Sequence, residues 1–178
     1  MGRKMARSGR VIFFIGGARS GKSRLAQNRA ESMAGELIYI ATAQPADAEM
    51  AERIARHRDD RDARWQTVEA PIDLPQALLK NCTAGCVVLI DCLTLWLSNL
   101  MMQDRDISAA QRELLAALGA VDSNVLLVTN EVGMGIVPDN ALARRFRDDA
   151  GRLHQEIAAS ADEVWFVAAG IGLPLKTP

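Results

Sequence analysis

The octet GGARSGKS at residues 16–23 is the feature that most narrows the fold of this chain. It matches the pattern Gly-x-x-x-x-Gly-Lys-[Ser/Thr], and it stands between the apolar run VIFFI (11–15) and a segment with helical patterning (22–33). A strand, this octet and a helix in succession are the context in which the pattern forms a phosphate-binding loop. The octet therefore predicts a nucleotide site at the end of the first strand.

The residue types within the octet fit the chemistry of a triphosphate. Gly16 and Gly21 let the backbone turn and bring N–H groups close to phosphate oxygens, and the N-terminus of the following helix adds partial positive charge. Lys22 is predicted to reach the terminal phosphates and Ser23 to bind Mg²⁺. A glycine-rich turn with no ligand is the weaker alternative.

Short apolar runs alternate with amphipathic segments along the whole chain. The runs are continuous rather than alternating, which is typical of parallel strands covered on both faces. Strands are predicted at 11–15, 36–41, 65–69 (the weakest), 86–91, 124–130 and 163–169. Helices are predicted at 22–33, 47–58, 72–80, 93–101, 107–118 and 139–160. This alternation predicts an α/β fold with an open, mostly parallel sheet and helices on both faces, whose ligands bind beyond the carboxyl ends of the strands.

The charge balance argues against several classes of partner. Lys and Arg total 21 and Asp and Glu total 22, so the net charge is −1, which gives no general attraction to nucleic acid or to an anionic membrane. No apolar run reaches the ~18 residues that a membrane-spanning helix needs. We therefore expect a cytoplasmic protein with no nucleic-acid partner and no membrane span.

The length of 178 residues fits one domain. We expect a flexible basic extension over residues 1–10 and a single nucleotide-binding catalytic domain over residues 11–178. Cys82, Cys86 and Cys92 form no CxxC pair, and we expect them to be reduced, structural thiols.

Polar residues follow two of the predicted strands at their carboxyl ends. Asp91 ends the strand CVVLID, where a carboxylate can hold Mg²⁺ directly or through water; the alternative is that it caps the helix that follows. Asn130 and Glu131 end the strand at 124–130. This pair could contact substrate, or the segment with Gly133 and Gly135 could simply form a loop.

The helix predicted at 139–160 carries arginines among acidic residues. Arg144, Arg145, Arg147 and Arg152 are interpreted as a solvated, ion-paired face, with a phosphate or subunit contact as the alternative. His154 lies on the same helix, and the sequence assigns it no role.

The other histidine, His57, lies among arginines in the segment AERIARHRDDRDARW (51–65). Met50, Ile54 and His57 share one face of the predicted helix at 47–58. A buried or boundary histidine is one interpretation. The other is a neutral imidazole that faces nucleotide phosphates and acts as a nucleophile, with cationic groups nearby to compensate charge.

Taken together, these segments resemble a known family. The motifs are GGARSGKS, YIATAQ, DAEMAERIARHRDDR, WQTVE, VLLVTNEVGMGIVPDNALARRFRDDAGRLHQ and ADEVWFVAAGIGLPLK. They resemble the bifunctional adenosylcobinamide kinase/adenosylcobinamide-phosphate guanylyltransferase of cobalamin biosynthesis, from about residue 11 to residue 176. The phosphate loop alone is shared by many families, whereas its combination with RIARHRDDR and TNEVGMGIVP is far more specific.

The resemblance implies a RecA-like P-loop fold, ATP and GTP as substrates, Mg²⁺, and adenosylcobinamide and its phosphate as acceptors. It also implies a homotrimer and a covalent guanylyl-histidine at His57, with Lys22 as the other catalytic residue. The metal positions that it implies are Ser23 and Asp91. The nucleotide-binding positions that it implies are Gly16, Gly17, Ala18, Arg19, Ser20, Gly21, Lys22, Ser23, Ala41, Thr42, Ala43, Arg58, Asp59, Asp60, Arg61, Glu69 and Asp91.

The sequence departs from the family pattern at two positions. Some members have glutamate where this chain has Asp91, and the shorter carboxylate favours a metal contact through water. Some members have a second histidine where this chain has Arg56, so His57 is the one histidine of this segment.

Two rival functions remain on the sequence alone. One is a P-loop small-molecule kinase without a covalent step, for which His57 would be dispensable. The other is a RecA-type ATPase that binds nucleic acid, against which the near-neutral charge and the lack of an aromatic–basic stretch both argue.

Overall fold

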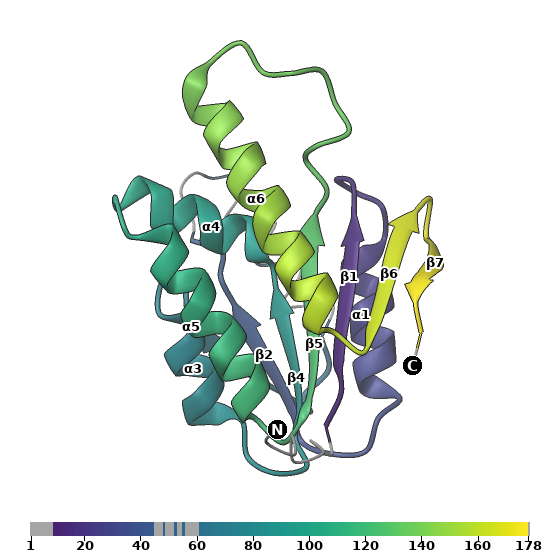
Figure 1. Ribbon diagram of the computed structural model, residues 1–178. Coiled ribbons are helices and arrows are strands. Elements are labelled where there is room, and N and C mark those ends of the chain that lie inside the picture. The colour runs from purple at the N-terminus through teal and green to yellow at the C-terminus, as the bar shows by residue number, and fades with distance from the viewer. Residues whose placement is uncertain (1–8, 45–47, 49–51, 53–54, 56–60, 178) are drawn as a thin grey trace, which may run out of the picture.

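The computed structural model describes residues 9–44, 48, 52, 55 and 61–177 of the chain. Its centre is one seven-stranded sheet in the order β3-β2-β4-β5-β1-β6-β7 (Figure 1). The strands are β1 (Val11–Gly16), β2 (Leu37–Ala41), β3 (Trp65–Glu69), β4 (Val87–Asp91), β5 (Asn124–Asn130), β6 (Glu163–Ala168) and β7 (Ile171–Lys176). All neighbouring strands are parallel except β6 and β7, which are antiparallel.

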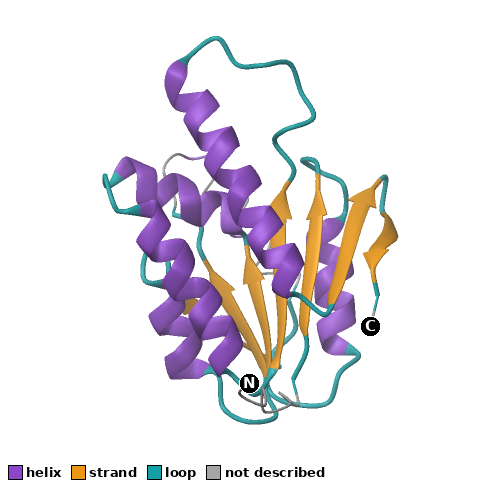
Figure 2. Cartoon of the chain, in the orientation of Figure 1, coloured by secondary structure: helices purple, strands orange, loops and turns teal. Residues whose placement is uncertain are grey.

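Helices cover both faces of this sheet, as Figure 2 shows. The described helices are α1 (Lys22–Glu31), α3 (Leu74–Asn81), α4 (Leu93–Met102), α5 (Ile107–Ala120) and α6 (Ala141–Ser160). The six predicted strands and the mostly parallel sheet are confirmed, and the predicted ends of these helices are correct to within two residues. Most of the helix predicted at 47–58 lies outside the described residues.

The strand β7 was not predicted from the sequence. Its segment, IGLPLK, contains Gly172 and Pro174, both of which are unfavourable inside a central strand. It forms because the turn at Ala169 and Gly170, where φ is 52° and 79°, folds the chain back against β6. Since β7 is an edge strand, a proline without an N–H group is tolerated there.

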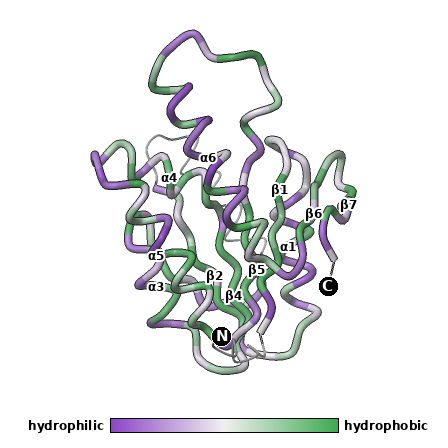
Figure 3. Tube along the Cα trace, in the orientation of Figure 1, coloured by the Kyte–Doolittle hydropathy of each residue, from purple (hydrophilic) through white to green (hydrophobic). Residues whose placement is uncertain are grey.

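Two hydrophobic cores lie on opposite sides of the sheet. On one side, Phe13, Ile40 and Ile90 pack against α3, α4, α5 and α6. On the other, alternate residues of the same strands pack against Ala26 and Ala30 of α1. The central strands are therefore apolar on both faces, and the tube in Figure 3 is mainly green along them. The continuous apolar runs in the sequence have this origin.

The amino-terminal residues that are described belong to the folded sheet. Gly9 is buried, and Arg10 donates from its backbone to Asn124 and pairs with the buried Glu163 at 3.3 Å. Residues 1–8 lie outside the described residues, so the division into an extension and one domain stays a prediction. Cys82, Cys86 and Cys92 are all free thiols, as expected.

Candidate active site

The parallel register brings the predicted site residues to one edge of the sheet. Gly16 at the end of β1 pairs with Asn130 at the end of β5. Ala41 at the end of β2 lies between Glu69 at the end of β3 and Asp91 at the end of β4. The carboxyl ends of five adjacent strands thus bring together residues that are more than 100 positions apart in the sequence.

The octet forms a tight loop between β1 and α1. Arg19 has φ 57° and Gly21 has φ 92°, left-handed conformations that turn backbone N–H groups into a concave cradle suited to an anion. A Cβ atom at Gly16 would lie 2.2 Å from the carbonyl oxygen of Val167, so only glycine fits there. Lys22 is buried, and its Nζ donates to the carbonyl of Gly17 at 3.0 Å. The lysine is therefore held across the loop where the terminal phosphates of a nucleotide are expected.

Two buried oxygen atoms at this edge have no hydrogen-bond partner. Within the described part of the chain, Ser20 Oγ and Asn130 Oδ1 are the buried side-chain atoms that make no hydrogen bond. Ser20 belongs to the phosphate loop, and Asn130 pairs with Gly16 on the neighbouring strand. An unsatisfied buried polar atom costs free energy. Their joint position beside the loop indicates a site that a ligand completes.

Asp91 does not cap the helix that follows it. The N-cap residue of α4 is Cys92, and no side chain caps that helix. Asp91 is instead the last residue of β4 and is half-buried. The alternative interpretation of Asp91 as a helix cap is therefore wrong, because the strand extends one residue too far for Asp91 to occupy the cap position.

The charges of Asp91 and Lys22 act in opposite directions on the pKa of the buried Cys92 thiol. Burial raises the pKa of this thiol, the carboxylate of Asp91 raises it further, and the ammonium of Lys22 lowers it. A cation and a carboxylate placed beside a phosphate loop are the groups that hold a triphosphate and its metal ion.

The residues present fit Mg²⁺ only in company with phosphate oxygens. Mg²⁺ prefers oxygen ligands and is commonly held by one or two carboxylates together with substrate phosphates. Asp91 and the hydroxyl of Ser23, in the first turn of α1, are oxygen donors of this kind. The described residues contain no cluster of three or more His, Cys, Asp or Glu side chains that could hold a metal ion in the absence of a bound nucleotide.

The segment Ala41–Ala43 contacts the end of β4. Thr42 is fully buried, and its hydroxyl donates to the carbonyl of Cys92 at 2.7 Å and accepts from the N–H of Cys92 at 2.8 Å. The side chain of Thr42 is thus engaged in holding the backbone next to Asp91. Ala43 is half-buried and Glu69 is exposed. Their predicted contacts with nucleotide stay predictions.

His57 lies outside the described residues, as do Arg58, Asp59 and Asp60. Arg61 is described, and its guanidinium carbon lies 3.7 Å from the centre of the Tyr39 ring. Tyr39 is buried on β2, where its register partner on β4 is Leu89, two residues before Asp91. Tyr39 was not among the predicted site residues. The only signal in the sequence was its place in YIATAQ, two residues before Ala41.

Glu131 shapes the loop that follows β5. Its carboxylate accepts hydrogen bonds from the N–H groups of Gly133 at 2.6 Å and Met134 at 3.1 Å. The loop then leads to α6, where Arg144 donates to the carbonyls of Pro138 and Asp139. Of the two interpretations of Glu131, the loop-forming one is supported.

The ion-paired face predicted on α6 is confirmed for three of its four arginines, Arg144 being the exception. Arg145 and Arg152 both pair with Asp149, at 3.7 and 2.9 Å, and Arg147 pairs with Asp148 at 3.1 Å. Arg145 and Arg152 are exposed to solvent, and Arg147 pairs with the exposed residue next to it in the chain. Each pair therefore contributes little stability. These three arginines therefore belong to an ion-paired helix face.

His154 is a structural residue between α6 and the sheet. Its Nε2 lies 2.8 Å from Thr129 Oγ1, and its ring packs 5.9 Å from that of Phe13. Burial lowers the pKa of His154 to about 4, against an opposing effect of Glu131. The imidazole is therefore neutral near pH 7.

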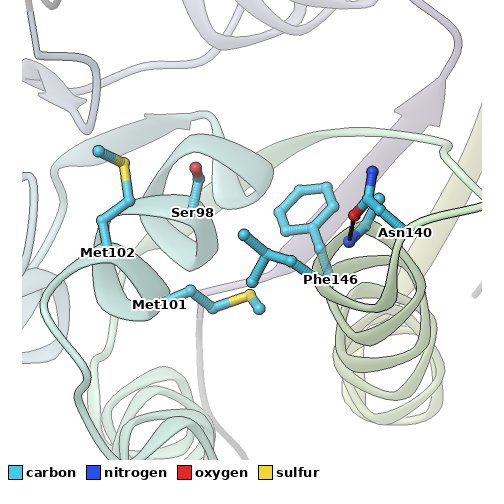
Figure 4. Close-up of a pocket in the computed structure, with 7 residues that line it drawn as sticks. Ser98, Met101, Met102, Asn140 and Phe146 are labelled. Carbon is cyan, nitrogen blue, oxygen red and sulfur yellow. Dashed lines mark hydrogen bonds between the residues drawn. The ribbon is translucent and has the colours of Figure 1, made fainter.

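A second concave region lies away from the phosphate loop, between the end of α4 and the start of α6 (Figure 4). Its volume is about 360 Å³, and it is lined by Ser98, Met101, Met102, Asn140, Leu142, Ala143 and Phe146. Asn140 caps α6 by accepting from the N–H of Ala143 at 2.7 Å. Because no lining residue is charged, this cavity suits an apolar group rather than a triphosphate.

The fold and this edge of the sheet define a P-loop nucleotide-binding protein. None of the described helices combines the length and the apolar character that crossing a membrane requires. The chain belongs to the CobU family, described as cobinamide kinase / cobinamide phosphate guanyltransferase, whose family model matches residues 12–175.

Characterised relatives agree with this family. The chain is 47% identical to the bifunctional adenosylcobalamin biosynthesis protein CobP of Pseudomonas aeruginosa, over 91% of this chain and 95% of the relative. It is 43% identical to CobU of Salmonella typhimurium and 44% identical to CobU of Escherichia coli, in each case over 93% of this chain and 99% of the relative.

Solved structures with little sequence identity share the fold. One solved ATPase domain aligns with a TM-score of 0.50 at 15% identity, over 90% of this chain and 70% of that one. A protein of Pyrococcus horikoshii aligns with a TM-score of 0.54 at 8% identity, over 98% of this chain and 89% of that one. These likenesses support the predicted P-loop α/β fold.

Proposed function

We propose that this chain carries out two successive reactions on one corrinoid at a single triphosphate site. In the first, ATP or GTP phosphorylates the aminopropanol hydroxyl of adenosylcobinamide. In the second, GTP transfers GMP to adenosylcobinamide phosphate through a guanylyl-histidine at His57, which gives adenosylcobinamide-GDP. The observation that carries the proposal is the phosphate loop with Lys22 held across it, at the sheet edge where β4 ends in Asp91, in a member of this family.

In the kinase step, the hydroxyl oxygen of the acceptor attacks the γ-phosphorus. A new O–P bond forms while the bond from the γ-phosphorus to the bridging oxygen breaks, and the nucleoside diphosphate leaves as the hydroxyl proton is released. The loop N–H groups and Lys22 stabilise the charge on the phosphate oxygens during transfer. This step needs no protein nucleophile.

In the guanylyl step, a neutral nitrogen of His57 attacks the α-phosphorus of GTP. The N–P bond forms, the bond to pyrophosphate breaks, and the imidazole becomes cationic. Lys22 and the loop hold the departing pyrophosphate, while Arg58 or Arg61 offsets charge that develops on the α-phosphate. A phosphate oxygen of the corrinoid then attacks the same phosphorus, the N–P bond breaks, and neutral imidazole is restored.

We assign the metal position to Ser23 and Asp91. Mg²⁺ bound there would neutralise charge on the phosphate oxygens in both reactions. Asp91 sits at the correct end of β4 for this role, and the hydroxyl of Ser23 belongs to the first turn of α1. We also assign the protein to the cytoplasm and, by family resemblance, to a homotrimer, which size-exclusion chromatography with light scattering measures directly.

Labelled GTP distinguishes the proposed function from its rivals. Supplied with adenosylcobinamide, the enzyme should first transfer γ-label from ATP or GTP to the corrinoid and then transfer α-label from GTP. A small-molecule kinase without a covalent step would transfer γ-label alone. A nucleic-acid-dependent ATPase would release phosphate without labelling the corrinoid, and either outcome would overturn the proposal.

A further inference from the structure

Exposed apolar side chains gather in one part of the described chain. Five of the nine large hydrophobic residues that are exposed there lie at the end of α4, at the start of α6 or in the segment between β5 and α6. These five, which we call the apolar rim, are Met102, Met134, Ile136, Val137 and Leu142. The exposed fraction reaches 82% for Met102 and 98% for Ile136. Apolar residues that gather in this way, rather than being scattered singly, indicate a binding surface.

The apolar rim adjoins the cavity between α4 and α6 (Figure 4). Two rim residues, Met102 and Leu142, line this cavity, whose volume is about 360 Å³. Met101 and Phe146 line it as well and pack against the larger hydrophobic core. The rim and the cavity therefore form one uncharged surface that rests on the rigid interior of the protein.

This surface lies at the same edge of the sheet as the phosphate loop. The helix α4 crosses the carboxyl ends of the strands, because Asn99 donates to the carbonyls of Thr42 at 2.8 Å and Pro71 at 3.0 Å, just after β2 and β3. The segment between β5 and α6 begins directly after Asn130, which pairs with Gly16 of the phosphate loop. In Figure 1 this segment extends beyond the arrowhead of β5. A ligand can therefore contact the rim while one of its arms reaches the phosphate loop.

Hydrogen bonds hold both ends of the segment between β5 and α6. At its start, the carboxylate of Glu131 accepts from two backbone N–H groups. At its end, Arg144 donates to two backbone carbonyls and Asn140 caps α6. These contacts leave the apolar side chains of the segment in solvent. A surface that is held in place before binding loses less conformational entropy when its ligand arrives.

We propose that the apolar rim and its cavity bind the corrin ring of adenosylcobinamide. This ring is a broad, flat macrocycle that carries methyl groups and neutral amides, so an uncharged apolar surface matches its chemistry. It is too broad to enter the phosphate loop, yet its aminopropanol arm must reach the γ-phosphate there. The ring must therefore lie on a neighbouring surface at the same edge of the sheet.

The size of the cavity indicates which part of the ligand it takes. Small-molecule sites commonly measure roughly 300–1,000 Å³, and this cavity of about 360 Å³ is at the lower end. It accepts one edge of the ring, while the apolar rim supports the ring face. The inference rests on the proposed function for the identity of the acceptor.

Leu142→Asp tests the inference by placing a carboxylate at the cavity. Leu142 is 67% exposed, so the fold should tolerate the change, whereas an unpaired charge against an apolar ring is unfavourable. The probe is dicyanocobinamide, titrated calorimetrically into the full chain without nucleotide. Leu142→Asp should raise its Kd by about tenfold or more. An unchanged Kd would overturn the inference.

Two control variants accompany this titration. Leu142→Met keeps an apolar side chain of similar volume and should leave the Kd within about twofold of wild type. Leu79→Asp adds the same charge at a residue that is 52% exposed on α3, outside the apolar rim, and should also leave the Kd within about twofold. A loss of affinity in Leu79→Asp equal to that in Leu142→Asp would contradict the location.

A second measurement separates binding of the ring from binding of the nucleotide. Leu142→Asp should bind GDP with a Kd within about twofold of wild type, because the phosphate loop is untouched. In the kinase reaction its KM for adenosylcobinamide should rise with little change in kcat, since the ring makes the same contacts before and during phosphate transfer. A fall in kcat at unchanged KM would overturn the inference.

The remaining outcomes are distinct from one another. If Leu142→Asp does not fold, as shown by its thermal midpoint, Ile136→Asp provides the same test at a residue that is 98% exposed. If either substitution lowers the mass measured by size-exclusion chromatography with light scattering and leaves the Kd unchanged, the surface binds a second copy of the chain and the inference is wrong. If the wild-type protein does not bind dicyanocobinamide, the proposed function itself is wrong, whereas binding that ignores both substitutions contradicts only the location.

Discussion

Replacement of Gly16 by alanine tests the geometry of the phosphate loop. The added Cβ would lie 2.2 Å from the carbonyl oxygen of Val167 and 2.8 Å from Ser20 Oγ. Ordinary contact begins at 3.4 Å, so the first distance is more than 1 Å too short. Val167 is fully buried and is paired with Gly16 in the sheet, so its carbonyl has no room to move away.

The expected loss of stability follows from this overlap. Overpacking a rigid interior costs roughly 1–3 kcal/mol, and the upper end applies because the obstacle is backbone. For a chain of this size each kcal/mol corresponds to about 2–4 °C, so a loss of about 3 kcal/mol should lower the Tm by roughly 6–12 °C.

Gly17→Ala is the matched control for thermal unfolding followed by circular dichroism. No protein atom lies within 4 Å of a Cβ at Gly17, so this exchange should change the free energy of unfolding by less than about 0.5 kcal/mol. Equal midpoints for the Gly16→Ala and Gly17→Ala proteins would refute the geometry described for the loop.

Three further predictions concern charged or titrating groups. Lys22→Ala should reduce both reactions by several orders of magnitude in kcat/KM, because both pass phosphate charge through the same loop; a near-normal rate for either one would exclude a shared site. Asp91→Asn should raise the Mg²⁺ concentration for half-maximal rate with little change in Tm, and an unchanged requirement would remove Asp91 from the metal position. His154 has a folded pKa of about 4, below its ordinary value near 6.5, so the unfolded chain takes up the proton more readily and stability should fall as the pH drops from 6.5 towards 4. His154→Gln should abolish this component, roughly 3 kcal/mol at its full extent, as measured by urea unfolding at pH 7 and pH 4.5; identical pH dependence in the two proteins would contradict it.

The elements that position the site could be predicted because local sequence encodes them. The octet sits between a strand and a helix, and the apolar run ending at Asp91 extends to the strand end that the structure shows. Only the backbone shows that Asp91 is not a helix cap. The metal-binding and capping interpretations of Asp91 differ by a single residue in where β4 ends and α4 begins. The edge strand β7 could not be predicted because its stability comes from pairing with β6 and not from its own residues.

The part of the site that the sequence missed depends on contacts between distant residues. The ring of Tyr39 lies under the guanidinium of Arg61, and its register partner on β4 is Leu89, two residues before Asp91. In the sequence it is one apolar residue in a buried strand, with no periodicity or motif spacing to distinguish it from its neighbours. The unsatisfied oxygens of Ser20 and Asn130 likewise depend on a long-range contact, because it is the pairing of β1 with β5 that brings Asn130 beside the phosphate loop.

The central claim is the covalent guanylyl-histidine, and peptide mapping after reaction with GTP labelled at the α-phosphate tests it most directly. Phosphoramidates survive alkali and break in acid, so the reaction is stopped in alkali before digestion. The account predicts GMP on the peptide that contains His57, and His57→Ala should take no label while it still phosphorylates adenosylcobinamide. GMP on Lys22 or His154, or no covalent GMP at all, would contradict the account.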